Sequence, residues 1–382
     1  MMNIMDIGMY NSYLEVNFGK MKDQYKKVQA AAGRRGVIPV LKANAYGIGL
    51  EPMADFLVNT MGADVLAVAQ TSEGVRLRQA GFRAPDIMLL GPAPEHAVPY
   101  AVENRLILPI FNRDNALMVE RAAAEQGGAA RVQIKINTGM NRIGVCEGED
   151  LDALLAFVKT LPHVLVCGVF THFVNATYTD DPQTPAAYEK FVRAVGQVRA
   201  AGIEPQYIHC CNTGATSWFR GDEISTHIRP GSLYMGYDSM DDGTNWLGVE
   251  ECVSWRAFVT NLHTIHAGES CGYCNHFVAE KDTLVATIDI GYADGLFRPM
   301  AQGSGFLLLN DTLAPYLACS MDQTMVDATN VPGLRVGDQA TIFGYSLNGA
   351  KLPLAQLQTY TGQNLTYPLC LTNQRVKRIY CY

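Results

Sequence analysis

The chain has 382 residues, of which 48% are hydrophobic and 18% are charged, and its formal net charge is −7. This length corresponds to two or three domains of about 150 residues each, and the ordinary balance of apolar and charged residues excludes a disordered or fibrous protein. The acidic balance disfavours a duplex nucleic-acid binder, because such proteins need a basic surface.

Membrane and export signals are absent from the sequence pattern. The longest apolar runs, such as residues 153–158, are far shorter than the ~20 residues of a membrane span. The N-terminal segment has no basic stretch before an apolar one, so we expect no signal peptide, no membrane partner and a cytoplasmic protein. Ten cysteines are too few for a disulfide scaffold. Cys271 and Cys274 form a C-x-x-C pair without a second such pair, and we therefore predict no metal site.

Short apolar or β-branched runs alternate with helix-like segments through the first 230 residues. The predicted strands are 37–42, 64–69, 86–90, 106–110, 131–137, 164–171, 206–210 and 226–229. The predicted helices are 18–32, 51–60, 71–79, 94–102, 114–125, 149–160, 185–201 and 212–219. This alternation predicts an α/β protein with a (β/α)8 TIM-type barrel. A doubly wound open sheet is the alternative, but no G-x-G-x-x-G follows the first strand.

The pattern changes after about residue 250, where strand-like runs are separated by Gly, Asn and Asp turns. These strands are predicted at 253–262, 283–290, 305–309, 313–318, 339–343 and 374–380. The sequence therefore predicts two domains, a barrel over 1–250 followed by a mostly β C-terminal domain over 251–382.

Polar residues interrupt the apolar runs at the predicted carboxyl ends of the barrel strands, where barrel enzymes place their active sites. Lys42 ends the first strand, and its ammonium is either at the barrel rim or a Schiff-base lysine with a lowered pKa. The other rim candidates are Lys135, Asn137, Arg142, His172, Asn212, Thr213, Arg229, Gly231 and Ser232. Together they outline a lysine, a phosphate cradle and cationic groups, which is the set that pyridoxal 5'-phosphate (PLP) requires.

Several motifs resemble those of the alanine racemase family. V-L-K-A-N-A-Y-G-I-G at 40–49 resembles the family's PLP signature, and K-I-N-T-G-M-N-R-I-G at 135–144 and R-P-G at 229–231 follow in the same order. D-I-G-Y-A-D-G at 289–295 and M-D-Q-T-M-V-D at 321–327 lie in the predicted β domain and are the more specific matches. The likeness extends from about residue 12 to about residue 380.

The resemblance implies a homodimer in which each active site takes residues from both chains and binds a small amino-acid substrate. Lys42 would carry PLP and act as one acid/base group, and Tyr292 from the partner chain would act on the opposite face. The match implies further roles, with Tyr46, His172, Asn212, Thr213, Arg229, Gly231 and Ser232 as cofactor-binding residues. Arg142 and Met321 would bind substrate. Lys135 matches a position that is often carbamylated.

The sequence departs from the family pattern at positions that bear on the substrate. Thr366, with Tyr367 beside it, stands where a tyrosine normally lines the substrate pocket, unless the alignment shifts by one residue. If Thr366 faces the pocket, the site gains space and a hydroxyl, and a polar substrate such as serine fits. Ala318 stands where arginine is frequent, and Asn137 stands where aspartate is common.

The favoured function is interconversion of L- and D-alanine by a two-base mechanism, which in this family supplies D-alanine for peptidoglycan. A serine or broad-specificity racemase is the alternative within the class. A PLP-dependent decarboxylase of basic amino acids is disfavoured, because such enzymes place a carboxylate at the pyridine nitrogen where Arg229 matches. A non-catalytic PLP-binding protein would leave Tyr292 and the C-terminal domain unexplained.

Overall fold

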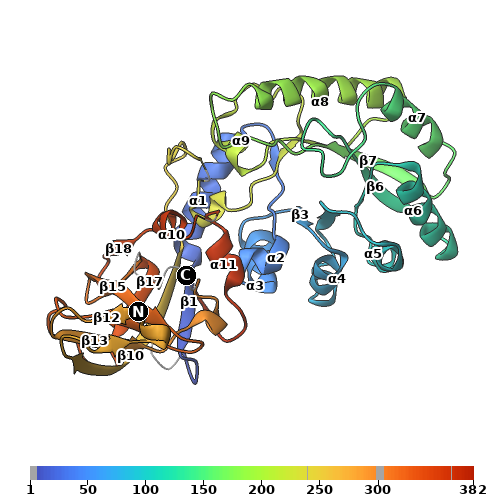
Figure 1. The fold of residues 1–382 in the computed structure, drawn as a ribbon. Coiled ribbons are helices and arrows are strands. Elements are labelled where there is room, and N and C mark those ends of the chain that lie inside the picture. Colours follow the sequence, from blue (N-terminus) through green and yellow to red (C-terminus); the bar gives the residue numbers. More distant parts are fainter. Residues whose placement is uncertain (1–6, 239, 298–304, 363) are drawn as a thin grey trace. The chain divides into compact units, whose positions relative to one another are not determined.

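The computed structural model describes residues 7–238, 240–297, 305–362 and 364–382 (Figure 1). The chain forms two compact units. The barrel unit consists of Lys22–Ala45 and Gly49–Val249, and the β unit consists of Met1–Met21, Tyr46–Ile48 and Glu250–Tyr382. The second unit thus begins beside the predicted division at residue 250, but it also contains an N-terminal segment and a short segment after Lys42.

The barrel unit contains, within its described residues, eight strands that pair in parallel. They are β2 (Gly36–Val37), β3 (Val65–Val68), β4 (Asp86–Leu89), β5 (Leu108–Ile110), β6 (Ala130–Lys135), β7 (Val164–Phe170), β8 (Tyr207–His209) and β9 (His227–Ile228). Each lies within or beside one of the eight runs that the sequence predicted, and the observed strands are shorter because the polar rim residues lie beyond the ladders.

The strands close into a ring. β2 pairs with β9, and a bridge between Val40 and Ala67 joins the β2 segment to β3. A second bridge between Met88 and Ile107 joins β4 to the β5 segment, and β5 through β8 form one sheet. The ring closes where the Thr226 N–H donates to the Ile208 carbonyl at 2.8 Å. The predicted (β/α)8 barrel is therefore confirmed, and the open sheet is excluded.

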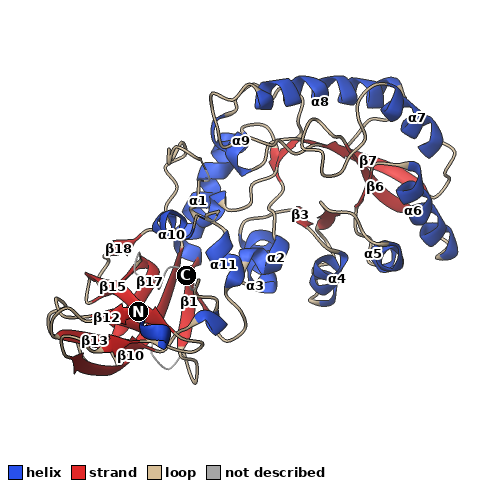
Figure 2. Cartoon of the chain, in the orientation of Figure 1, coloured by secondary structure: helices blue, strands red, loops and turns tan. Residues whose placement is uncertain are grey.

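Helices cover the outside of the barrel strands (Figure 2). In chain order they are α1 (Phe18–Ala32), α2 (Lys42–Tyr46), α3 (Leu50–Asp55), α4 (Thr71–Gln79), α5 (Val98–Glu103), α6 (Arg113–Glu125), α7 (Glu149–Val158), α8 (Gln183–Ala200) and α9 (Thr213–Trp218). The barrel interior is filled by fully or nearly buried side chains from successive strands, among them Ile38, Val65, Met88 and Ile107. Burial of these apolar side chains is the main stabilising contribution to the unit.

The β unit is built on one nine-stranded sheet in its described part. The strands are β1 (Ser12–Asn17), β10 (Val253–Ile265), β13 (Thr283–Ile288), β14 (Phe306–Leu309), β15 (Thr312–Cys319), β16 (Thr324–Asp327), β17 (Gln339–Tyr345), β18 (Lys351–Leu352) and β19 (Lys377–Cys381). β10 pairs with both β13 and β17, so the sheet closes on itself as a barrel. Two short strands, β11 (Ser270–Cys271) and β12 (Phe277–Val278), form a separate hairpin, and α10 (Leu354–Thr361) and α11 (Tyr367–Leu371) precede β19.

The N-terminal strand explains why the β unit includes the start of the chain. β1 pairs antiparallel with β10 and parallel with β19. The segment Tyr46–Ile48 joins the same unit because the Arg378 guanidinium donates to the Gly47 carbonyl and the Tyr380 hydroxyl donates to the Ile48 carbonyl. The sequence predicted neither β1 nor β16.

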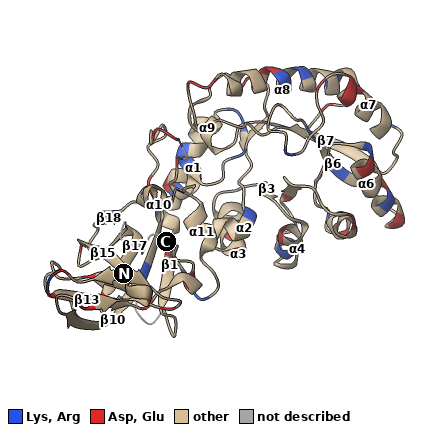
Figure 3. Cartoon of the chain, viewed as in Figure 1, with Lys and Arg blue, Asp and Glu red and all other residues tan. Residues whose placement is uncertain are grey.

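Charged residues of both signs occur along the outer helices α6 and α8, whereas those of α7 are acidic (Figure 3). In α6, for example, Arg113 and Asp114 are neighbours, as are Glu120 and Arg121. No helix in the described residues is long and apolar enough to cross a membrane.

Candidate active site

Lys42 is followed by an unusual turn of the chain. Ala43, Asn44 and Ala45 have φ values of 55°, 55° and 52°, so the short helix α2 is left-handed at these positions, and none of the three is a glycine. A left-handed helical residue with a Cβ costs about 1–2 kcal/mol because the Cβ approaches the following carbonyl oxygen. The surrounding residues must therefore hold this turn, which directly follows Lys42, in place.

Arg229 follows β9 and is almost fully buried, at 3% exposure. Its guanidinium donates to the Thr171 carbonyl at 2.8 Å and to Nδ1 of His209 at 2.7 Å. It also lies 3.3 Å from Nδ1 of His172. These three acceptors, from the ends of β7 and β8, fix the position of the guanidinium.

Two buried residues, His209 and Gln133, form a series of hydrogen bonds that ends at Arg229. Neither residue was among the site residues predicted from the sequence. Because Nδ1 of His209 accepts from Arg229, Nε2 carries the ring proton and donates to Gln133 Oε1 at 3.0 Å. The Gln133 amide in turn donates to the Leu89 carbonyl at 2.9 Å. Burial, Arg229, His227 and Lys135 hold the pKa of His209 well below its usual value. His209 is therefore neutral and has one tautomer.

Lys135 is the last residue of β6 and is only 3% exposed. Its ammonium nitrogen lies 4.7 Å from the centre of the Phe170 ring. Burial lowers the pKa of Lys135 well below its usual value, and the nearby charges of Arg229 and Arg142 lower it further. In the part of the chain that the structure describes, no carboxylate forms an ion pair with Lys135. Lys135 therefore loses its proton more readily than a lysine at the surface does.

His172 lies just beyond β7 among cationic groups. Its Nε2 is 3.5 Å from the Asn212 side-chain amide. Burial lowers its pKa well below the usual value, and Arg229, Lys135, Arg142 and Lys42 add to the shift. The His172 ring is therefore neutral at neutral pH. The four cationic residues that lower its pKa are all site residues predicted from the sequence.

The loop after β6 carries Arg142. Val145 bridges to Ile136, which closes the loop, and Asn137 organises its interior. The Asn137 side-chain oxygen accepts from the backbone N–H groups of Gly139 and Asn141 at 3.2 and 3.0 Å, and its amide donates to the Asn141 side chain. An amide at position 137, where aspartate is common in the resemblance, can make both kinds of contact. Arg142 itself is exposed.

The ends of β8 and β9 form a cradle of backbone and hydroxyl groups. Asn212 caps α9 by accepting from the Ala215 N–H at 3.2 Å. Thr213 Oγ1 accepts from the Gly231 N–H at 2.9 Å, so the hydroxyl proton of Thr213 points elsewhere. The Ser232 hydroxyl donates to the Tyr237 carbonyl at 3.1 Å. Asn212, Thr213, Gly231 and Ser232 thus lie together, with Ser232 directed into the protein.

Two buried cysteines before Asn212 lie close to an acidic group. Cys210 and Cys211 have sulfur atoms 3.8 Å apart, and the Cys211 thiol lies 3.4 Å from Asp222. Asp222 is already paired with Arg35 at 2.8 Å, and burial and Cys210 raise the pKa of Cys211. In the β unit, Cys271 packs in an apolar cluster and Cys274 is exposed.

Tyr292 lies in the β unit in a tight turn, Tyr292–Asp294, with its side chain 41% exposed. The turn packs on the M-D-Q motif, because the Tyr292 N–H donates to the Ser320 carbonyl and the Ala293 N–H donates to the Met321 carbonyl at 3.2 and 2.9 Å. A Cβ on Gly291 would lie 2.2 Å from the Met321 carbonyl oxygen, so only glycine permits this approach. The two family-like motifs therefore form one structural piece.

Ion pairs brace the same turn. Asp294 caps it by accepting from the Gly291 N–H at 2.8 Å and pairs with Arg375 at 3.2 Å. Arg375 also pairs with Asp322 at 2.8 Å, and the Asn373 amide donates to the Ala293 carbonyl. Burial raises the pKa of Asp294, with Arg375 acting in the opposite direction. These contacts hold the backbone beneath Tyr292.

The departures from the family pattern have local structural roles. Thr366 precedes α11, and its hydroxyl and backbone N–H both donate to the Asn364 side chain at 3.1 Å. Tyr367 packs edge-on against Phe297 at 5.8 Å. Ala318 lies against Gly272, where an added Cβ would be 2.3 Å from the Ala318 side chain, so this contact requires glycine at 272.

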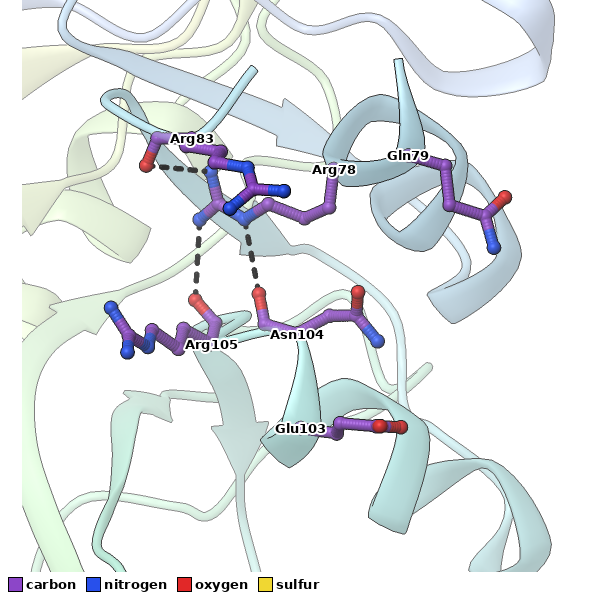
Figure 4. A pocket seen from close by; sticks show the side chains of 6 residues that line it. All are labelled: Arg78, Gln79, Arg83, Glu103, Asn104 and Arg105. Atoms are coloured by element: carbon purple, nitrogen blue, oxygen red, sulfur yellow. Dashed lines mark hydrogen bonds between the residues drawn. The ribbon is translucent and has the colours of Figure 1, made fainter. Parts of the chain in front are cut away.

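An arginine-lined pocket of about 410 Å³ lies away from these residues (Figure 4). The Arg78 guanidinium donates to the carbonyls of Phe82, Pro85 and Asn104 at 2.6, 2.8 and 3.0 Å. These residues precede β4 and β5, at the end of the barrel opposite to Lys135 and Arg229. Arg78 therefore links the loops at the amino-terminal ends of the barrel strands.

Known proteins share this architecture over nearly the whole chain. The family model for the alanine racemase N-terminal domain matches residues 16–239, and the model for the alanine racemase C-terminal domain matches residues 252–380. The chain belongs to the alanine racemase family. It is 31% identical over 342 residues to the alanine racemase of Desulfovibrio desulfuricans, covering 90% of each chain.

Solved structures share the fold of this chain. The alanine racemase of Clostridium difficile superposes with a TM-score of 0.91 at 24% identity, over 98% of this chain and 96% of that one. The alanine racemase of Bartonella henselae with covalently bound pyridoxal phosphate gives a TM-score of 0.86 at 23% identity, over 97% and 99%. The predicted fold class, a barrel with a β-rich second domain, is thereby confirmed, and the protein is an alanine racemase-type enzyme.

Proposed function

We propose that this chain is a PLP-dependent racemase that interconverts L- and D-alanine with Lys42 and Tyr292 as its two acid/base groups. Family membership supports the reaction class. The arrangement of the barrel rim supports the cofactor, and the separate turn that carries Tyr292 supports a second proton-transfer group.

The residues at the ends of β8 and β9 fit the phosphate group of PLP. The Thr213 hydroxyl proton is not used by Gly231, for which Thr213 is the acceptor, and it can donate to an anion. The resemblance also assigns Asn212, Gly231, Ser232 and Tyr46 to cofactor binding, and in this structure the Gly231 N–H and the Ser232 hydroxyl donate within the protein, to Thr213 and to the Tyr237 carbonyl. PLP, when bound, supplies an electron sink that makes the α-proton of an amino acid acidic enough to remove.

The observation that carries the assignment is the set of acceptors around Arg229. Its hydrogen bonds to the Thr171 carbonyl, His209 and His172 fix the position of the guanidinium, and an arginine side chain does not give up its proton. Opposite a pyridine nitrogen it donates a hydrogen bond and never a proton. This favours a racemase over a decarboxylase of basic amino acids, in which a carboxylate would occupy this position, and Tyr292 argues against a non-catalytic PLP-binding protein.

The two proposed acid/base groups come from different units. Lys42 would move a proton at one face of the substrate's α-carbon, and the Tyr292 hydroxyl would move a proton at the other face. As the resemblance implies, Tyr292 and Met321 would act on the site of a partner copy in a homodimer. Arg142 and the Met321 backbone would bind the substrate carboxylate.

Lys135 fits a carbamylated lysine. Its lowered pKa makes the neutral amine, the form that reacts with carbon dioxide, more accessible, and the carbamate anion would be favoured by the nearby charges of Arg229 and Arg142. An anion here would orient Arg142 and would remove the mutual repulsion of these cations.

Alanine is the substrate we propose, with D-alanine for peptidoglycan as the pathway that the family implies. Serine or a broader set is the alternative, because Thr366 stands where the resemblance places the pocket tyrosine unless the alignment shifts by one residue to Tyr367. The cytoplasmic location predicted from the sequence stays a prediction.

The test is α-hydrogen exchange in deuterium oxide. Purified protein with PLP is incubated with L-alanine and separately with L-serine, and the products are resolved by chiral chromatography. Deuterium incorporation together with the D-isomer would support the proposal, and the ratio of the two rates would identify the substrate. A protein that binds PLP but exchanges neither substrate would contradict it.

A further inference from the structure

A carboxylate from α4 reaches the residue that follows Lys42. The Ala43 N–H donates to Glu73 Oε1 at 2.6 Å. The other carboxylate oxygen, Oε2, accepts from the N–H groups of Ala69 and Gln70 at 2.9 and 3.1 Å. One side chain therefore ties three backbone amides from two segments that are about 30 residues apart in the chain.

The left-handed turn after Lys42 depends on such contacts. Ala43, Asn44 and Ala45 all have positive φ values that residues with a Cβ rarely adopt. Asn44 is held at its side chain, whose oxygen accepts from the Leu50 N–H at 3.0 Å. The Ala45 N–H donates to the Leu41 carbonyl at 2.9 Å. At Ala43, the first residue of the turn, the amide is held by Glu73.

Capping of α4 does not account for this arrangement. Glu73 stands at the third position of α4, where a glutamate commonly binds the capping residue, and here that residue is Gln70. The capping contact needs only Oε2, which accepts the Gln70 N–H. Oε1 is directed to Ala43, in a charge-assisted hydrogen bond that the helix does not need.

We propose that Glu73 is a positioning residue for catalysis, which fixes the Ala43 amide and thereby the direction from which the Lys42 side chain enters the active site. The proposal rests on the function proposed for Lys42. The ion pair between Arg76 and Glu51 is a neighbouring contact that reinforces the same region, since Arg76 also lies 3.4 Å from the Asn44 side-chain oxygen.

Glu73→Gln is the informative variant. Its single amide oxygen can accept from Ala43 or from the α4 end, but not from both, while the side-chain length is kept. Glu120→Gln is the matched control, because Glu120 also accepts a backbone N–H, that of His163 at 2.9 Å, on the outer helix α6. Both variants lose a carboxylate-to-amide contact, but only the first lies next to Lys42.

Three quantities are measured in the holoenzyme. Borohydride reduction and peptide mapping give the fraction of Lys42 bonded to PLP at a fixed, sub-saturating PLP concentration. Hydrogen exchange gives the protection of the amides over 40–48. Steady-state kinetics with L- and D-alanine give kcat and KM separately.

For Glu73→Gln we expect faster exchange over 40–48, several-fold less PLP bonded to Lys42, and a kcat lower by about 10²-fold with little change in KM, because a small misplacement of a catalytic group has this order of effect. Glu120→Gln is expected to match the wild-type protein in all three. Wild-type attachment, exchange and kcat in Glu73→Gln, even with a lower melting temperature, would overturn the proposal and leave Glu73 as a helix cap.

A different result would point to the proposed function itself. If PLP in the wild-type protein is found on another lysine, the role of Lys42 fails, and the role of Glu73 fails with it. If PLP is on Lys42 in both proteins to the same extent, only the role of Glu73 fails.

Discussion

The two units hold their candidate catalytic residues in different ways. In the barrel unit, Arg229 and His172 belong to a buried network in which each polar group has a partner on another strand end. In the β unit, Tyr292 is 41% exposed, and the backbone turn beneath it is what the structure fixes. The network in the barrel unit fixes the position of the Arg229 charge and the tautomer of His209. The turn in the β unit fixes the backbone that carries the Tyr292 hydroxyl.

This difference has a physical reason. A buried cation needs several acceptors, because its desolvation is costly. The ends of parallel strands supply these acceptors from segments that are distant in the chain. A phenol at the surface needs a rigid backbone support, which begins with the local contact of the Asp294 carboxylate and the Gly291 N–H and is completed by Arg375, from a later segment of the β unit.

Lys42→Ala is expected to give the largest effect on this comparison. It removes the barrel unit's acid/base group and the covalent attachment point for PLP, so racemisation should fall by about 10⁴-fold, at the upper end for one proton-transfer group. The rate is measured with L-alanine by chiral chromatography, and absorbance reports the bound cofactor. The exposed Lys159→Ala is the control. Unchanged covalent binding in Lys42→Ala would remove Lys42 from its proposed role.

Tyr292→Phe is expected to have the second-largest effect and to slow proton exchange mainly from one enantiomer. PLP binding should be kept, and α-proton exchange from one enantiomer should fall by about 10²–10⁴-fold while the other changes much less. Exchange is measured separately from L- and D-alanine in deuterium oxide, with the exposed Tyr273→Phe as the control. An equal loss for both enantiomers would contradict the two-face model.

His209 makes the barrel network sensitive to acid. Its folded-state pKa lies well below its unfolded value of about 6.5. The unfolded state therefore binds more protons as the pH falls below about 6.5, and the free energy of unfolding falls by up to about 1.4 kcal/mol per pH unit for this group. The stability that the neutral ring contributes is present above the unfolded pKa and is lost on acidification. His172 acts in the same direction.

Urea unfolding at pH 7.5, 6.0 and 5.0 tests this prediction. His209→Gln should show a smaller loss of stability between pH 6.0 and 5.0 than the wild-type protein, whereas the control His266→Gln, at an exposed position of the β unit, should follow the wild type. A pH dependence that does not change in His209→Gln would mean that other groups set the acid limit.

Thr366→Tyr is expected to give the smallest effect. If Thr366 faces the substrate pocket, a tyrosine fills the space, and the preference for alanine over serine should rise by about tenfold, the lower end for one added pocket contact. The ratio of kcat/KM values for the two substrates measures this, with Tyr367→Phe as the neighbouring control. An unchanged ratio would show that the pocket tyrosine of the family is not replaced at 366.

Much of the fold follows from the sequence pattern. Apolar runs alternating with amphipathic segments predict the eight barrel strands, because each strand is buried on both faces and each helix on one. The strand β1 was missed because its partners, β10 and β19, come more than 200 residues later. β16 was not predicted because it has only four residues, Thr324–Asp327, all of which lie inside the M-D-Q-T-M-V-D motif.

The sequence by itself determined which residues stand at strand ends and in the G-Y-A-D-G and M-D-Q motifs, since these depend on local order along the chain. Only the tertiary structure decided that His209 and Gln133 hold Arg229, and that Glu73 binds the amide after Lys42. Each of these contacts joins segments between 20 and 76 residues apart. No local pattern encodes such a contact, because a buried hydrogen bond depends on where two strand ends meet and not on either strand alone.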